Sequence, residues 1–228
     1  MGTFETVGSG DLTTRAYVAG EAGSGGPAVV VFHPWWGLND DVVTYADRLA
    51  DAGFTVLAPD LYQGSIATSI DEADKLSSAL DTDLANGLAL AAVDHLAGRL
   101  EPGRRFAAVG FSMGAAWSIW SPAERDVVAA SVVYYGTVMG PSLGRASVPV
   151  LGHFAETDPY ELPDWVTEFE NALRAHGRDV TIHRYPGTGH WFAEPSNEAY
   201  DATAADLAFG RTTEFLRRHL DPAHRADR

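Results

Sequence analysis

Residues from the middle of the chain onwards have the types and the order of a nucleophile followed by its proton-transfer partners. The nucleophile is Ser112, at the centre of the segment Gly110-Phe111-Ser112-Met113-Gly114. The segment follows an apolar run and precedes a helical pattern. A Gly-x-Ser-x-Gly sequence in that position is typical of the sharp turn that exposes the nucleophilic serine of a hydrolase. An ordinary strand-to-helix turn with a solvated serine has the same pattern, so the partners of Ser112 decide between the two interpretations.

The base that a serine needs is the next candidate, because a serine hydroxyl is a weak nucleophile near neutral pH. His190 is the predicted base, since it lies in a Gly- and Pro-rich loop between a strand and the last helix, where catalytic side chains gather. His153 falls inside an apolar run, and we expect it to be a hydrogen-bonded core residue. The other histidines fit the role of base less well: His176, His183, His219 and His224.

The predicted acid that orients the base is Asp158. It follows the apolar run at 148–154, and ligands of open α/β sheets bind at the carboxyl ends of such strands. Asp158-Pro159 also has the pattern of a helix N-cap followed by proline at the first helical position, and both roles are compatible. Glu156 and Asp164 are the rival acids.

Two backbone N–H groups are needed to stabilise the oxyanion that forms during acyl transfer. One is expected from Met113, directly after the nucleophile, and the other from the loop after the apolar run at 28–33. Pro34 has no N–H, so Trp35 is the predicted second donor. Trp36 is a candidate wall of an apolar pocket, and packing of both tryptophans in the core is the alternative. The further pocket candidates are Tyr62, Tyr135 and Trp191.

No motif indicates a metal or a cofactor, and we expect neither. His33 together with His153 or His190 lacks the closely spaced ligand pair of a helical metal site. The Gly-rich segment at 20–27 lacks the spacing of a dinucleotide site and is expected to be a surface turn. The absence of cysteine removes disulfides, thiolate ligands and a cysteine nucleophile together.

Composition limits the partners. The 228 residues include 16 Lys and Arg against 31 Asp and Glu, a net charge of −15, which opposes binding to nucleic acid or to an anionic membrane. No apolar run reaches the roughly 18 residues of a membrane span. No signal-peptide pattern is visible, so we expect a cytoplasmic protein. A small-molecule ligand fits this composition, and the state is expected to be a monomer or a homodimer.

Strand-like and helix-like patterns alternate along the chain, which predicts an α/β fold with a mostly parallel sheet. The expected strands are 12–18, 28–33, 55–58, 106–110, 127–135, 148–154 and 180–185. The expected helices are 41–52, 69–100, 113–121, 159–176 and 197–219. Ser69 and Thr82 are candidate caps, so 69–100 is expected to form two helices. No linker divides the chain, and we expect one domain over residues 1–228.

Six blocks occur in order over nearly the whole chain: His33-Pro34-Trp35-Trp36-Gly37-Leu38-Asn39, Ala58-Pro59-Asp60-Leu61-Tyr62, Gly110 to Gly114, Tyr134-Tyr135-Gly136, Gly152 to Pro159, and Tyr185 to Phe192. Together they resemble the dienelactone hydrolase family of α/β-hydrolases. The resemblance implies the α/β-hydrolase fold, with helices flanking the central sheet and no large cap domain. It also implies a catalytic triad of Ser112, Asp158 and His190, and hydrolysis of small carboxylic esters or lactones.

One departure from the family's pattern concerns the mechanism. The enzyme that names the family uses a cysteine nucleophile, and a glutamate in its first loop takes part in activating the thiol. This chain has Ser112 and Pro34 at the two matching positions. A serine activated by histidine does not need that carboxylate, so the two changes agree and predict an ordinary serine-esterase mechanism through an acyl-enzyme.

A second departure concerns the substrate. The resemblance implies that arginines hold the carboxylate of a dienelactone, and one of them matches Glu194 in this chain. A charged Glu194 would repel an anionic ligand, so the sequence predicts a preference for neutral esters or lactones. Three alternatives stay open: a dienelactone hydrolase in the strict sense, an acyltransferase with the same triad, and a non-catalytic ligand-binding protein on this scaffold.

Overall fold

The computed structural model describes residues 1–20 and 26–220. Within them, eight strands form one sheet in the order β1-β2-β4-β3-β5-β6-β7-β8, with β1, β2 and β4 paired antiparallel and the other pairs parallel. The strands are β1 (Thr3–Ser9), β2 (Leu12–Ala19), β3 (Ala28–Phe32), β4 (Thr55–Pro59), β5 (Phe106–Phe111), β6 (Val128–Tyr134), β7 (Val150–Ala155) and β8 (Val180–Tyr185). Most of the turn expected at 20–27, and His224, lie outside the described residues.

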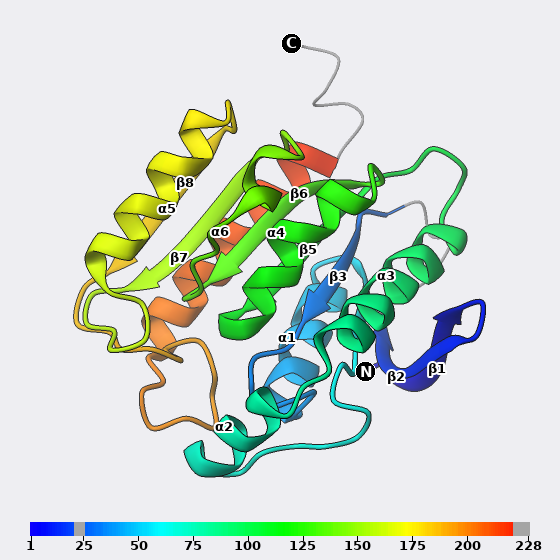
Figure 1. Cartoon of the computed structure of the whole chain (residues 1–228), viewed down its shortest axis with the longest axis horizontal. Coiled ribbons are helices and arrows are strands. Elements are labelled where there is room, and N and C mark those ends of the chain that lie inside the picture. The colour runs from blue at the N-terminus through cyan, green and yellow to red at the C-terminus, as the bar shows by residue number, and fades with distance from the viewer. Residues whose placement is uncertain (21–25, 221–228) are drawn as a thin grey trace.

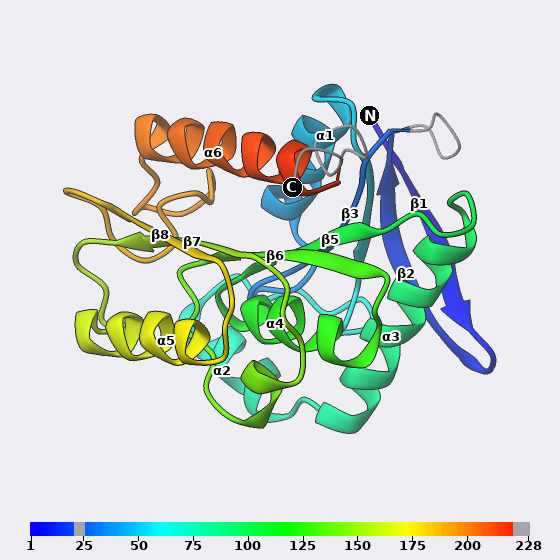
Figure 2. The ribbon, with the colours of Figure 1, turned by 90° about the horizontal axis from the view of Figure 1, so that it is seen from above.

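Helices cover both faces of this sheet (Figure 1). The helices are α1 (Asp40–Asp51), α2 (Ile70–Ser78), α3 (Thr82–Gly98), α4 (Ala115–Glu124), α5 (Pro163–Ala175) and α6 (Ala202–Leu220), with short 3-10 turns η1 (Ser112–Gly114) and η2 (Pro141–Gly144). Figure 2 shows α1 and α6 on one face and α3, α4 and α5 on the other. The predicted α/β architecture and the division of 69–100 into two helices are confirmed. None of the described helices is long and apolar enough to cross a membrane.

The central strands are buried on both faces. Every residue of β3, β5, β6 and β7 is buried, as expected for parallel strands between two layers of helices. Their continuous apolar runs made them predictable from the sequence. The edge strand β1 was missed, because Val7 is its only buried residue and its sequence shows no apolar periodicity.

Side-chain caps start the helices that follow the early strands. Asn39, Ser69 and Asp81 each accept a hydrogen bond from the backbone N–H three residues later, where the first turn of a helix has unpaired donors. The expected cap at Ser69 is confirmed, whereas the cap of α3 is Asp81, one residue before the predicted Thr82. The cap at Asn39 ends the loop after β3, and it thereby fixes the loop that contains the predicted oxyanion donor.

A buried chain of hydrogen bonds ties α6 to the sheet. Thr212 Oγ1 lies 2.8 Å from the Tyr134 hydroxyl and 2.9 Å from His153 Nε2, and His153 Nδ1 lies 2.7 Å from the Tyr185 hydroxyl. Burial holds the pKa of His153 well below its usual value of 6.5, so the ring is neutral. His153 is thus the hydrogen-bonded core residue that the sequence predicted. These hydrogen bonds also anchor α6, which follows the loop that carries His190.

Replacing Thr212 by valine tests this anchor. Thr212→Val keeps the shape of the side chain but leaves His153 Nε2 without a partner and leaves the Tyr134 hydroxyl with Tyr45 as its remaining partner. We expect a loss of about 1–3 kcal/mol in the free energy of unfolding, measured by urea denaturation. Thr167→Val on the exposed surface of α5 is the matched control and should change the same quantity by less than about 0.5 kcal/mol. Equal effects of the two substitutions would contradict the anchoring role.

Candidate active site

The turn at Ser112 is strained, and the surrounding backbone leaves room only for glycine at positions 110 and 114. Ser112 has a φ of 47°, in the left-handed region that non-glycine residues seldom adopt. A Cβ on Gly110 would lie 2.2 Å from the carbonyl oxygen of Gly114, and one on Gly114 would lie 2.4 Å from that of Phe32. The two glycines of the sequence motif therefore let β5 turn sharply into η1 and α4, which exposes Ser112 at the carboxyl end of the sheet.

Three side chains from separate loops meet at this turn. Ser112 Oγ lies 3.0 Å from His190 Nε2, and His190 Nδ1 lies 2.7 Å from Asp158 Oδ2. The imidazole and the carboxylate are almost fully buried, with 3% and 2% of their side chains exposed. Because an N–H on Nδ1 is held by the carboxylate, Nε2 is free to accept the proton of the serine hydroxyl. The structure thus brings together the three residues that the sequence singled out.

The local role of Asp158 differs from the sequence prediction. The helix after β7 begins at Pro163 with Leu162 as its cap residue, so Asp158 is not a helix N-cap. Instead its Oδ1 accepts hydrogen bonds from the N–H groups of Tyr160 and Glu161 at 2.8 and 3.0 Å, and its Oδ2 faces His190. These contacts form a tight turn that orients the carboxylate, since short polar side chains favour turns as much as caps.

The two rival acids lie elsewhere. Glu156 accepts a hydrogen bond from the N–H of Gly187, and Asp164 is in the first turn of α5. A third carboxyl, that of Glu161, was not singled out by the sequence. Burial raises its pKa to about 7, and it accepts a hydrogen bond of 2.6 Å from the Thr137 hydroxyl. This contact joins the loop after β6 to the loop that carries Asp158.

His33 fixes the loop after β3, which holds the predicted oxyanion donor. Its Nδ1 lies 2.7 Å from the carbonyl oxygen of Pro34, and its Nε2 accepts the N–H of Leu61 at 3.0 Å. Nδ1 is therefore assigned the proton, which it donates to the Pro34 carbonyl oxygen. Burial lowers the pKa of the His33 ring. Both nitrogens are therefore occupied by backbone groups. The close packing of Gly114 on the carbonyl of His33 sets this loop directly beside Met113.

Aromatic rings surround the imidazole of His190. Trp35 stacks on Trp191 at 6.0 Å between ring centroids, and Trp36 lies 5.3 Å from Trp191. Tyr160 contacts three of these rings, with its ring centroid 5.0 Å from that of His190, 5.1 Å from that of Trp191 and 5.7 Å from that of Trp35. Tyr160 was missed by the sequence analysis, although its position two residues after Asp158 offered a signal. We call Trp35, Trp36, Tyr160 and Trp191 the aromatic cluster.

Tyr135 lies underneath His190 and not on an open surface. It is completely buried, has a φ of 37°, and its ring centroid is 4.9 Å from that of His190. Its hydroxyl donates a hydrogen bond of 2.8 Å to Glu194 Oε1. The sequence placed Tyr135 among the pocket candidates, and in the structure it supports the imidazole from below.

Glu194 requires a correction to the predicted charge of the site. Only 3% of the residue is exposed, and desolvation, followed by the proximity of Asp41, raises its pKa to about 8. Its side chain is therefore mostly uncharged at neutral pH, and the repulsion of anions that the sequence predicted is weak there.

Two cavities adjoin the site. The smaller, the Pro34 cavity, holds about 10 Å³, roughly the space of one water, and is lined by Pro34, Asp41, Val42, Tyr45, Phe111, Ala193 and Glu194. The larger, the Met113 pocket, has about 430 Å³ and is lined by Ser77, Leu80, Thr82, Asn86, Met113, Ala116, Trp117, Trp120, Val138 and Ser142. Tyr62, a predicted pocket residue, is largely buried and donates its hydroxyl to Met113 Sδ at 3.3 Å.

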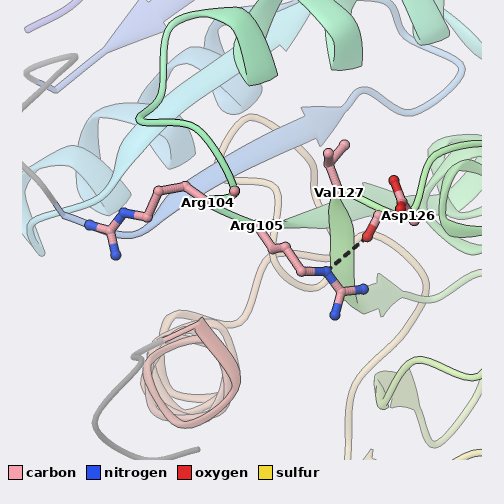
Figure 3. A pocket seen from close by; sticks show the side chains of 5 residues that line it. Arg104, Arg105, Asp126 and Val127 are labelled. Carbon is pink, nitrogen blue, oxygen red and sulfur yellow. Dashed lines mark hydrogen bonds between the residues drawn. The ribbon is translucent and has the colours of Figure 1, made fainter.

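A third cavity, the Arg105 pocket, lies at the amino ends of β5 and β6, away from the carboxyl ends where Ser112 lies. It has about 420 Å³ and is formed by residues just before β5 and β6, including Arg104, Arg105, Asp126 and Val127 (Figure 3). Arg105 Nε donates to the carbonyl oxygen of Asp126 at 2.8 Å. The residues that line the Arg105 pocket include no serine and no histidine, and the pocket lies away from the contacts between Ser112, His190 and Asp158.

Comparison with known proteins finds relatives that match nearly the whole chain. The chain is 29% identical to "Protein usf" of Aquifex pyrophilus, covering 96% of this chain and all of the relative. It is 27% identical to a carboxymethylenebutenolidase of Pseudomonas putida, covering 90% and 91% of the two chains. The crystal structure of a dienelactone hydrolase-like promiscuous phosphotriesterase from metagenomic libraries superposes with a TM-score of 0.80 at 25% identity, covering 96% and 98%.

The family model completes the comparison. It matches residues 14–220, which includes every residue of the site described above. The predicted fold, with a mostly parallel sheet flanked by helices and without a large cap domain, is therefore confirmed as the α/β-hydrolase fold. The chain belongs to the dienelactone hydrolase family and is a hydrolase of carboxylic esters or lactones.

Proposed function

We propose that the chain hydrolyses small esters or lactones by a serine acyl-enzyme mechanism. The observation that carries the proposal is the continuous chain of contacts from Ser112 Oγ through His190 to Asp158, at 3.0 and 2.7 Å. Ser112 attacks the carbonyl carbon while His190 takes its proton, and Asp158 stabilises the imidazolium that forms. His190 then protonates the leaving oxygen, which leaves an acyl-enzyme on Ser112. In the second half of the reaction His190 takes a proton from water, the water attacks the acyl carbonyl, and His190 returns the proton to Ser112 Oγ.

The oxyanion that forms in each step needs two donors, and we assign this role to the N–H groups of Met113 and Trp35. Met113 follows the nucleophile, and the packing of Gly114 on β3 sets the loop of Trp35 beside it. Losing one such donor typically lowers turnover by about 10²–10³-fold. The alternative acceptor is an alcohol, which would make the protein an acyltransferase. Product analysis with added alcohols separates the two.

The preferred substrate is a neutral ester or lactone. Neither the Pro34 cavity nor the Met113 pocket has a Lys or Arg among its lining residues, so a substrate carboxylate finds no cationic partner there. The alternative substrate is a carboxylate-bearing lactone, because the Pseudomonas putida relative is named a carboxymethylenebutenolidase. A cytoplasmic location and a monomeric or homodimeric state stay predictions from the sequence.

Substitution of the triad residues tests the mechanism. Ser112→Ala should lower kcat for p-nitrophenyl acetate by about 10⁴–10⁶-fold, because the nucleophile is lost. Asp158→Asn should lower it by about 10³–10⁴-fold, because the imidazole loses its charge partner and its tautomer. Ser147→Ala, at an exposed position, is the control and should keep the parent rate. Retained turnover in a folded Ser112→Ala protein would falsify the assignment of the nucleophile.

Comparison of the rates with a neutral and an anionic lactone tests the substrate class. We expect kcat/KM for an uncharged lactone to exceed that for a dienelactone of similar size by about tenfold or more at neutral pH, since the carboxylate has no cation to bind. The measurement is steady-state kinetics on purified protein with both substrates. Faster turnover of the dienelactone would instead support the strict dienelactone hydrolase.

The pKa of Glu194 predicts how stability depends on pH. Between about pH 4.5 and its folded pKa of about 8, native Glu194 keeps a proton that the unfolded chain releases, so the free energy of unfolding falls as pH rises. Glu194→Gln removes this dependence. We expect the variant to exceed the parent by on the order of 4 kcal/mol near pH 8, with the difference falling below about 1 kcal/mol near pH 5 and vanishing below about pH 4.

Urea denaturation at several pH values measures this difference. Glu214→Gln is the control, because Glu214 lies on the exposed side of α6 and pairs with Arg218 in solvent. The control should follow the parent at every pH within about 0.5 kcal/mol. A constant offset of Glu194→Gln across the whole range would show that the carboxyl is ionised at neutral pH after all.

A further inference from the structure

The Met113 pocket is large enough to hold part of a substrate and has no role in the mechanism above. Its volume of about 430 Å³ is within the usual range of small-molecule sites, about 300–1,000 Å³. Met113 directly follows Ser112, and Ala116 lies one helical turn further along α4. Met113 therefore connects the pocket to the proposed nucleophile, its neighbour in sequence, and the lining residues of α3 and α4 put the pocket on the face of the sheet that these two helices cover (Figure 2).

The lining of this pocket is apolar and uncharged. Leu80, Met113, Ala116, Trp117, Trp120 and Val138 are its apolar lining residues, and no Asp, Glu, Lys or Arg is among the lining residues. The other lining groups are hydroxyls and the amide of Asn86, whose Oδ1 is already occupied by the indole N–H of Trp117 at 3.0 Å. Such a surface fits a hydrocarbon group and offers no partner to a carboxylate.

The position of His190 decides which part of an ester reaches the pocket. His190 must approach both Ser112 Oγ and the leaving oxygen, so the alcohol part lies towards His190 and the aromatic cluster. The loop of His190 leads into α6, which lies on the other face of the sheet from α3 and α4 (Figure 2). The acyl chain extends from the carbonyl carbon away from the leaving oxygen, towards Met113.

We propose that the Met113 pocket binds the uncharged alkyl or aryl acyl chain of the substrate. The inference rests on the proposed function, because it takes Ser112 as the attacking group. It adds a specificity that the triad does not contain: acyl chains of several carbons are preferred over acetyl. Each methylene that enters an apolar pocket should raise kcat/KM by about fourfold until the pocket is filled.

A series of p-nitrophenyl esters from acetate to octanoate tests the proposal. The readout is the ratio of kcat/KM for octanoate to kcat/KM for acetate. In the parent protein we expect the ratio to exceed about 10. Val138→Phe places a ring inside the pocket and should lower the ratio by at least about tenfold. Val138→Ala widens the pocket and should move the optimum to longer chains, so the two variants change the profile in opposite directions.

Val127→Phe is the matched control, because it makes the same substitution in the Arg105 pocket at the far edge of the sheet (Figure 3). The control should keep the parent ratio. A parent ratio near one, or equal ratios in the parent and both Val138 variants, would overturn the proposal while acetate hydrolysis continued. Unimpaired acetate turnover by Ser112→Ala would instead contradict the proposed function, so the two failures are distinguishable.

A binding measurement covers the case of a variant that folds poorly. Trp117 and Trp120 line the pocket, so octanamide, an uncharged chain, should change the tryptophan fluorescence of Ser112→Ala protein and acetamide should not. Adding Trp120→Ala should raise the Kd for octanamide, read from the remaining Trp117, by at least about threefold, because one apolar wall is removed. An unchanged Kd in the double variant would place the chain elsewhere and overturn the proposal.

Discussion

The strained turn at Ser112 is the constraint on which the rest of the site depends. A φ of 47° at a serine costs on the order of 1–3 kcal/mol and persists only because the surroundings hold it. Three glycines do so: Gly110 packs on the carbonyl of Gly114, Gly114 on that of Phe32, and Gly136 on that of Ser112. The ends of β3, β5 and β6 therefore converge at van der Waals distance. The loop of Trp35 and the ring of Tyr135 are placed by the same packing that exposes the serine.

Sequence reasoning predicted the parts whose signal is local. The buried strands are continuous apolar runs, and the motif around Ser112 requires its two glycines for backbone reasons that hold in any such turn. Asp158 and His190 were found because the ends of parallel strands meet at one edge. The helix start at Asp158 was predicted wrongly, since an Asp-Pro pair fits a tight turn as well as a cap. Tyr160 and the support of His190 by Tyr135 depend on contacts between distant loops, which a local pattern does not contain.

The two sides of Ser112 differ in chemistry. Towards His190, the aromatic cluster and the buried imidazole form a rigid, ring-lined wall that contacts the turn of Asp158. Towards α3 and α4, the Met113 pocket is roomier and lined by flexible as well as aromatic side chains. Met113 lies at the boundary, with its sulfur held by the hydroxyl of Tyr62. On the proposed mechanism, the side of His190 positions the reacting atoms and the side of the Met113 pocket receives the variable part of the ester.

The two departures from the family's sequence pattern meet in space. Pro34 and Glu194 are separated by most of the chain, yet both line the Pro34 cavity. The first loop has lost the family's glutamate, and a carboxyl group reaches the same region from the segment after His190. It is not a free anion there, because burial beside Asp41 raises its pKa to about 8. Glu194 Oε1 accepts a hydrogen bond from the hydroxyl of Tyr135, whose ring lies against His190. The carboxyl therefore contacts the support of the base and not the nucleophile, which agrees with a serine that is activated by histidine alone.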